Sequence, residues 1–171
     1  MMARLTILLL SFVAVQGIFA QETGIPSGRR PSNTISVNLL GDGANVSLNY
    51  EKLIGINDAF FITARAGAGY GRQLTLGNDS LNLPVYLAIP VHVTINAGKG
   101  RHFAELGMGN TLNAGNVDPH YLYYLIYGYR FYPLNRNNIS IRIFGNLLLN
   151  KKDDFHNLYF VPFGFSLGYV F

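Results

Sequence analysis

The chain has 171 residues, which is enough for one domain with a full core. Hydrophobic residues make up 49% of it and charged residues only 13%, about half the usual charged share of a soluble domain. The net charge is +4, but the basic residues are scattered apart from the pairs Arg29-Arg30 and Lys151-Lys152, so we expect no nucleic-acid partner. Because cysteine is absent, disulfides, zinc–thiolate sites and cysteine nucleophiles are excluded.

Residues 1–20 have the three parts of a secretory signal peptide. Arg4 lies near the start, an apolar run extends from Leu5 to Val15, and Ala20 is the small residue before the expected cleavage. The alternative is an uncleaved helical anchor, but the run is short for a membrane-spanning helix and no stop-transfer charges follow it. Residues 21–32 are rich in glycine and proline without strand or helix periodicity, so they are predicted to form a flexible periplasmic lead-in.

From Asn33 to Phe171, apolar and polar residues alternate in about eight segments that are separated by turn residues. The segments are 34–40, 44–53, 59–71, 83–96, 102–112, 120–132, 139–149 and 158–171. No segment after the signal approaches the roughly 18 apolar residues of a spanning helix, so any membrane span must be made of strands. The pattern predicts an all-β domain at 33–171, folded as a closed antiparallel up-and-down β-barrel of about eight strands.

The lengths of the connections predict the orientation of the barrel, and one proline predicts a local irregularity in a strand. The short turns lie near Ile56, Lys99 and Asn135, and the longer loops span 71–82, 113–119 and 150–157. If Asn33 begins on the periplasmic side, the short turns face the periplasm and the longer loops face outward, as in outer-membrane barrels. The tight turn at Gly41–Gly43 breaks this asymmetry. Pro90 lies inside the fourth segment, and because a closed barrel has no free edge, we expect a β-bulge there.

Apolar and polar residues alternate along the strands of both soluble and membrane barrels, so alternation alone does not separate the two classes. The composition of the polar face does. Its positions hold mainly Gly, Ser, Asn and Thr with isolated charges, which are too sparse for a solvated surface. The pattern therefore favours a transmembrane barrel with lipid outside and a filled polar lumen. Aromatic residues near the segment ends fit a lipid–water boundary: Tyr70, Tyr121, Tyr129, Phe131, Tyr159, Tyr169 and Phe171. A secreted lipocalin-like binder with an apolar cavity is the soluble alternative.

The last residue is aromatic, and apolar or aromatic residues precede it at every second position. The set is Phe163, Phe165, Leu167, Tyr169 and Phe171. It resembles the C-terminal signal that outer-membrane barrels present to their assembly machinery. The stretches SLNYEKL, AELGMGNTL, YGYRFYP and PFGFSLGYVF are similar to those of an uncharacterised family of small bacterial outer-membrane β-barrel proteins, with an architecture similar to OmpX-type eight-stranded barrels. The resemblance implies the outer membrane of a Gram-negative cell and no particular activity.

Five charged residues on the polar face form the main candidate site. They are Glu51, Arg65, Glu105, Arg130 and Arg142, with His92, Tyr86, Tyr124 and Ser166 as candidate companions. Isolated charges in a narrow lumen are costly to desolvate, so we expect opposite signs to pair, with bidentate arginine–carboxylate geometry. This favours a structural plug over a gated ion path, because an eight-stranded interior is only wide enough to be filled by side chains.

Loop residues and glycines offer weaker candidates. Residues of the types used in hydrolytic or metal sites lie in the predicted outer loops: Asp79, Ser80, Asp118, His120, Asp153 and His156. Their spacing does not place a nucleophile beside a base, and each acidic–histidine cluster is short of a full ligand set, so we expect no enzyme, metal or cofactor. Two Gly-X-Gly stretches, at 67–69 and 107–109, open no helix as a phosphate loop would, and we expect them to leave room for Arg and Tyr side chains.

The sequence thus predicts a non-enzymatic outer-membrane protein with a structural or surface-interaction role exercised through its outer loops. The expected partners are outer-membrane lipid, the barrel-assembly machinery and an extracellular partner that contacts the loops, and the expected form is a monomer. A narrow channel for small solutes is the alternative. A lipid hydrolase with its site at the rim is less favoured.

Overall fold

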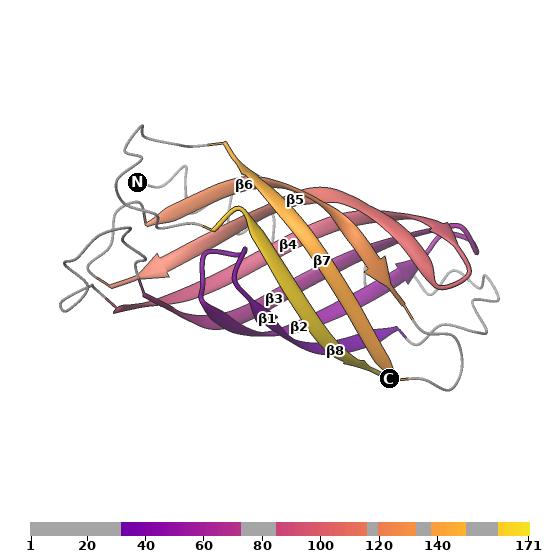
Figure 1. Ribbon diagram of the computed structural model, residues 1–171, viewed down its shortest axis with the longest axis horizontal. Coiled ribbons are helices and arrows are strands. Elements are labelled where there is room, and N and C mark those ends of the chain that lie inside the picture. Colours follow the sequence, from indigo (N-terminus) through magenta and orange to yellow (C-terminus); the bar gives the residue numbers. More distant parts are fainter. Residues whose placement is uncertain (1–31, 73–84, 116–119, 133–137, 150–160) are drawn as a thin grey trace, which may run out of the picture.

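The computed structural model describes residues 32–72, 85–115, 120–132, 138–149 and 161–171, which form a closed β-barrel (Figure 1). Its strands are β1 (Asn33–Leu39), β2 (Val46–Gly55), β3 (Phe60–Arg72), β4 (Val85–Lys99), β5 (His102–Ala114), β6 (Tyr121–Phe131), β7 (Ile139–Leu148) and β8 (Phe163–Val170). Each strand is antiparallel to both neighbours, and β1 pairs with β8 to close the barrel. The predicted all-β, eight-stranded antiparallel barrel is therefore confirmed. The described residues include no helix long and apolar enough to cross a membrane.

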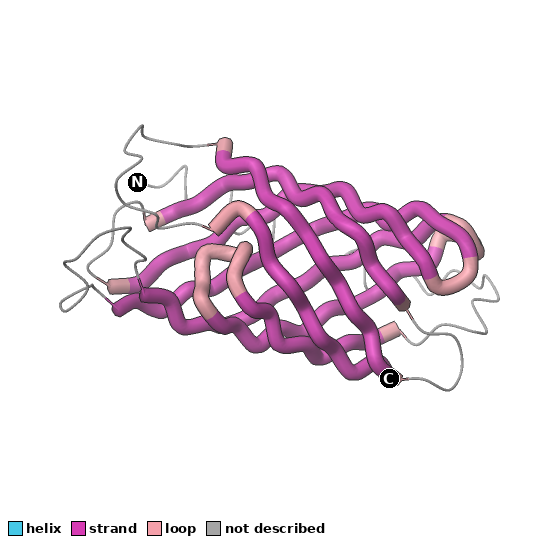
Figure 2. Tube along the Cα trace, in the orientation of Figure 1, coloured by secondary structure: helices cyan, strands magenta, loops and turns pink. Residues whose placement is uncertain are grey.

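The two ends of the barrel differ (Figure 2). One end, which we call the terminal end, holds both ends of the barrel chain and the short connections 56–59 and 100–101. Backbone hydrogen bonds in both directions join Asn33 to Phe171 there, at 3.0 and 2.9 Å. We call the opposite end the loop end. The connection 40–45 joins β1 to β2 on that side of the barrel.

The strand registers determine the width of the barrel. A path along paired residues that leaves β4 at Ala97 returns to β4 at Leu87, ten residues nearer the loop end. The path passes through Ala104, Tyr129, Ile143, Phe165, Leu39, Val46 and Tyr70. A stagger of ten residues over eight strands tilts the strands by about 40° and gives a backbone radius of about 8 Å. Inward side chains from opposite walls can therefore meet at the axis.

The residues of each strand alternate between the lumen and the outer face, because successive side chains of a strand point to opposite sides. In β8 the alternation has no exception. Phe163, Phe165, Leu167 and Tyr169 are exposed, and the four residues between and after them are buried. The exposed set is the apolar set, which is the reverse of a soluble barrel.

The pairing around Pro90 corrects one expectation. No β-bulge is present at Pro90, because β4 keeps the same register with β3 on both sides of it, from Ala66↔Val91 to Gly69↔Ala88. The ladder to β3 is instead interrupted over two residue pairs, while the pairing of Pro90 with β5 continues. A missing donor is thus tolerated without an inserted residue. The last strand begins at Phe163 within the described residues, and the predicted start at 158 lies outside them.

Candidate functional site

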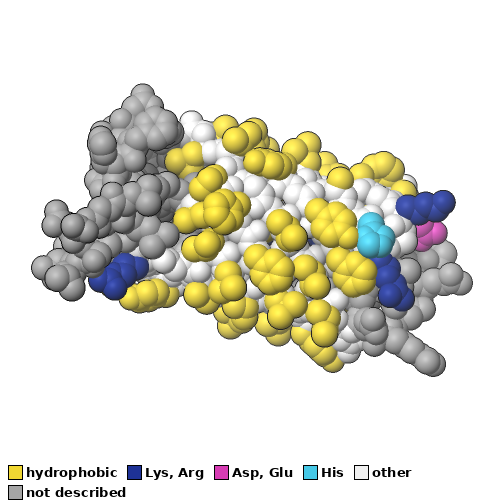
Figure 3. All heavy atoms as spheres, viewed as in Figure 1, with side chains coloured by type: hydrophobic (Ala, Val, Ile, Leu, Met, Phe, Trp, Pro, Cys, Tyr) yellow, Lys and Arg dark blue, Asp and Glu magenta, His cyan; other side chains and the backbone are white. Residues whose placement is uncertain are grey.

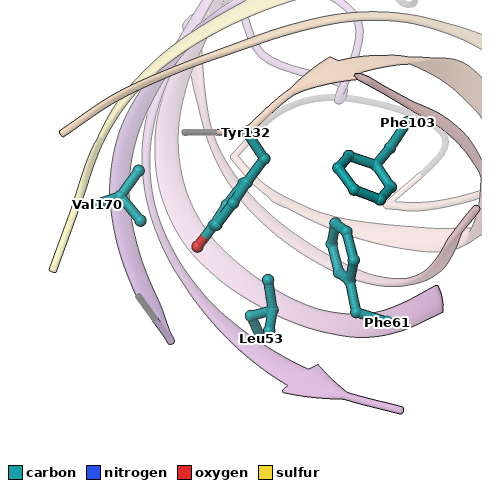
Figure 4. Packing of buried hydrophobic residues seen from close by; sticks show 5 residues of the cluster. All are labelled: Leu53, Phe61, Phe103, Tyr132 and Val170. Atoms are coloured by element: carbon teal, nitrogen blue, oxygen red, sulfur yellow. The ribbon is translucent and has the colours of Figure 1, made fainter. Parts of the chain in front are cut away.

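An apolar cluster closes the lumen at the terminal end (Figure 4). We call it the terminal plug, and its members are Leu53, Phe61, Phe103, Tyr132 and Val170. The ring centroid of Phe61 lies 4.8 Å from that of Phe103 and 5.7 Å from that of Tyr132. Each member is at most 7% exposed. Side chains from four strands and from the residue after β6 are thus buried together inside the barrel at this end.

The five charged residues singled out in the sequence lie next to the terminal plug, towards the loop end, and we call them the charge network. Glu51 and Arg65 are register partners on β2 and β3. Nε and Nη2 of Arg65 donate to Oε2 of Glu51 at 3.1 and 3.0 Å. Arg130 approaches from β6, on the opposite wall, and its Nη1 and Nη2 donate to Oε1 and Oε2 of Glu51. This contact has the bidentate geometry, and it ties two walls of the barrel together.

Glu105 completes the charge network between two like charges. Arg130 and Arg142 are register partners on β6 and β7, an arrangement that repels unless an anion separates them. Oε1 of Glu105 accepts from Nη2 of Arg130 at 3.1 Å, and Oε2 accepts from Nε of Arg142 at 2.5 Å. The Arg142 guanidinium also lies 3.8 Å from the ring centroid of Phe144. Ser166, the register partner of Arg142, is buried beside it. The structure brings all five charges together, each side chain at most 3% exposed.

The connection 40–45 turns into the lumen at the loop end, so it is more than the tight turn expected from Gly41–Gly43. It stops well short of the ends of β3 and β4 (Figure 1). Leu40 and Gly41 have φ angles of 63° and 87°, in the left-handed region, which is strained for leucine and free for glycine. Nδ2 of Asn146, from β7, donates to the carbonyl of Gly41. We call this connection the loop plug.

Asp42 is the residue that links the loop plug to the charge network. It is fully buried, and its Oδ2 accepts from Nδ2 of Asn38 at 2.7 Å and from Oγ of Ser47 at 2.8 Å. Oδ1 of Asn38 in turn accepts from Nη1 of Arg65 at 3.1 Å. Burial raises the pKa of the Asp42 carboxyl, and the hydrogen bonds from Ser47 and Asn38 oppose that shift. This role could not be predicted from the sequence, because Gly-Asp-Gly is an ordinary turn composition.

A second hydrogen-bonded chain reaches the loop plug from the other side of the lumen. Nε2 of His92 lies 2.8 Å from the hydroxyl of Tyr124, which lies 2.8 Å from Oγ1 of Thr111. Thr111 donates to the carbonyl of Asp42 at 2.7 Å. The chain joins β4, β6 and β5 to the loop plug. His92 is the register partner of Arg65, so this chain begins beside the charge network, and Tyr124 continues it to the loop plug.

Inward glycines make room for large neighbours. A Cβ at Gly109 would lie 2.5 Å from the ring of Tyr124, and one at Gly71 would lie 2.2 Å from the ring of Tyr86, which is also buried. At Gly67 the nearest atom belongs to an asparagine side chain, and no arginine atom is among the three nearest at any glycine of 67–69 or 107–109. The glycines thus leave space for tyrosine, as expected, and for neighbouring strands, but not for arginine.

Exposed apolar side chains cover the face of the barrel drawn in Figure 3 between its two ends, and every described strand contributes exposed large apolar residues. Leu106 and Met108 are 66% and 64% exposed, although both lie within β5. Outward lysines and arginines of the described strands occur only near strand ends, at Lys52, Arg72 and Lys99. Soluble monomers rarely expose continuous apolar surface of this extent.

The five residues of the predicted assembly signal all point outward. Their exposed fractions range from 38% for Phe165 to 61% for Phe163. The rings of Tyr169 and Phe171 stack at the terminal end, with centroids 6.4 Å apart. The signal pattern is thus a continuous outer stripe along β8, next to the seam with β1.

Most residues of the hydrolytic and metal alternatives lie outside the described part of the chain. These are Asp79, Ser80, Asp118, Asp153 and His156. His120 is described and is exposed directly before β6. Within the described ranges, no group of three or more His, Cys, Asp or Glu side chains is placed to hold a metal ion.

Comparisons with known proteins do not identify a relative. A scan against protein-family models, a search of the curated proteins and a search of the solved structures each found no match to this chain. The resemblance to small outer-membrane barrels therefore stays a prediction. The function has to be argued from the lumen and the outer face.

Proposed function

We propose that this chain is an integral outer-membrane β-barrel whose lumen is permanently filled and whose activity is a structural or surface-interaction role at the loop end. The observation that carries the proposal is the inverted distribution of polarity, with apolar side chains outside and all six buried charged residues of the described barrel inside. A membrane has no water to satisfy backbone groups, and a closed barrel satisfies them between strands. The missing free edge and the apolar outer face both fit lipid as the surrounding solvent.

Three closures in series support a filled lumen rather than a channel. The terminal plug is apolar, the charge network is ionic, and the loop plug is held by hydrogen bonds. An ion would have to displace all three, and the charge network would lose its partners in the process. Planar bilayer recording of the purified protein is expected to show no stable conductance. A reproducible single-channel current from wild-type protein would overturn this part of the proposal.

The two chain ends support delivery to the outer membrane. Residues 1–20 have the composition of a secretory signal peptide, and residues 163–171 have the alternating aromatic pattern of an assembly signal. The proposal therefore includes export, cleavage before Gln21 and contact with the barrel-assembly machinery. Peptide mapping of the mature N-terminus checks the cleavage site, and a mature protein that still begins at Met1 would contradict it.

Membrane fractionation tests the central claim. Expression of the full chain in a Gram-negative host is expected to place the protein in the outer-membrane fraction, extractable only with detergent. Folded protein is expected to migrate differently from boiled protein in a denaturing gel, because a closed barrel resists the detergent until it is heated. Recovery in the soluble periplasmic fraction, without a heat-dependent shift, would refute the membrane barrel and favour the soluble binder instead.

A further inference from the structure

The outer face carries a compact group of cationic and aromatic side chains at the terminal end. Lys99, His102 and Phe131 are register partners in one row across β4, β5 and β6. Arg101 lies in the turn between the first two and is exposed, as is Lys99. A Cβ at Gly100 would meet no atom within 4 Å.

The neighbouring row towards the loop end has two small residues at its middle. Its outward residues are Phe60, Ala97, Ala104 and Tyr129, from β3 to β6. Phe60 and Tyr129 are 45% and 43% exposed, and the two alanines lie between these rings. We call this row, in which two small side chains are flanked by two aromatic rings, the alanine groove. Beyond it the next row, Ile62, Ile95, Leu106 and Tyr127, is apolar.

The polar end of the groove is ordered by contacts of His102. Its Nδ1 lies 2.5 Å from the hydroxyl of Tyr129, and its ring lies 5.7 Å from that of Phe131 in an edge-on arrangement. Neither Lys99 nor Arg101 makes an ion pair with an acid in the described residues. The described acid of this end is Asp58, in the turn between β2 and β3. With two cations against one acid, the described residues of this rim have a net positive charge.

We propose that the alanine groove and the cations above it form a binding site for an anionic phospholipid of the adjacent leaflet. The inference rests on the proposed function, because it requires the outer face to lie in lipid. The headgroup phosphate contacts Lys99, Arg101 and the His102–Tyr129 pair, and the acyl chains lie along the alanine groove and the apolar row beyond it. The charge of the rim and its continuity with the apolar face select a lipid anion over a free phosphate, which would gain nothing from the groove.

Retention of lipid in nanodiscs tests the site. The full-length protein is reconstituted with equal amounts of phosphatidylglycerol and phosphatidylcholine, and native mass spectrometry after mild release counts the lipids that remain bound. Wild type is expected to retain phosphatidylglycerol in preference. The double variant Lys99→Gln/Arg101→Gln is expected to weaken this retention roughly thirtyfold, since each cation that contacts the headgroup contributes about a factor of five.

Two further variants separate the site from general electrostatics. Ala104→Leu fills the alanine groove without changing charge and is expected to lower retention, whereas Lys52→Gln removes a cation of the same end on β2 and is expected to leave it unchanged. Equal retention of both lipids by wild type, or equal losses in Lys52→Gln and the double variant, would overturn the lipid site alone. If wild-type protein did not enter the nanodiscs as a heat-shifting barrel, the proposed function would fail and the site with it.

Discussion

Replacing Glu105 by glutamine is the sharpest perturbation of the charge network. Glutamine keeps the shape, but it turns one acceptor oxygen into a donor that faces a guanidinium. Glu105 supplies acceptors to both Arg130 and Arg142, and its side chain is fully buried. The net charge of the network rises from +1, with three arginines and two glutamates, to +2. Removing one partner of a buried ion pair typically costs about 3–5 kcal/mol, so we expect a loss of that size.

The assay is urea unfolding in lipid vesicles, followed by the fraction with folded gel mobility, because the chain has no tryptophan to report by fluorescence. Adding Arg142→Gln to Glu105→Gln returns the network to +1, so the double variant is expected to lose less than the sum of the single losses, with a coupling of about 0.5–3 kcal/mol. Asp58→Asn, at an exposed position, serves as the control, and its expected loss of unfolding free energy is below about 1 kcal/mol. A loss under about 1 kcal/mol for Glu105→Gln, or strict additivity, would refute a network in which each charge depends on its partners.

Three further predictions concern the loop plug, an inward glycine and the outer face. Asp42→Ala removes the acceptor that anchors the loop plug, so we expect a loss of about 1–3 kcal/mol and faster amide hydrogen exchange in residues 40–45; unchanged exchange would contradict the anchoring role. Gly109→Val drives a Cβ into the ring of Tyr124, for an expected loss of about 1–3 kcal/mol in the same urea assay. Met108→Arg, at the middle of β5, is expected to cost about 2–4 kcal/mol in vesicles. A neutral result there would mean that this position faces water.

Strand alternation was predictable because it depends on local geometry alone. A two-residue period assigns every side chain to one face, so the closed barrel and its inward charges followed from the order of polar and apolar residues. The faces of β8, for example, could be assigned from Phe163 to Phe171 without knowing the register. Which charges touch was not predictable. Arg130 and Glu51 lie 79 residues apart and meet only because the stagger of the barrel brings β6 opposite β2.

The inward position of the loop plug could not be predicted from the sequence. Nothing in Gly-Asp-Gly distinguishes a turn that enters the lumen from one that points into solvent, since both need the same left-handed backbone. The difference lies in the acceptors and donors on distant strands, such as Thr111 on β5 and Asn146 on β7. The β-bulge predicted at Pro90 was wrong for a similar reason. The register between β3 and β4 is the same on both sides of Pro90. The missing backbone donor therefore interrupts the pairing with β3 locally, and no bulge is formed.

The three closures differ in chemistry, and this difference argues against a gate. A gate needs one element with two arrangements of similar free energy. Displacing the loop plug alone leaves the charge network, which joins β2, β3, β5, β6 and β7. Protonating or screening the charges leaves the terminal plug, which has no titratable member near neutral pH. Because no single one of these changes opens the axis, the proposed role of the interior is stability, and we expect any binding partner to contact the two ends of the barrel.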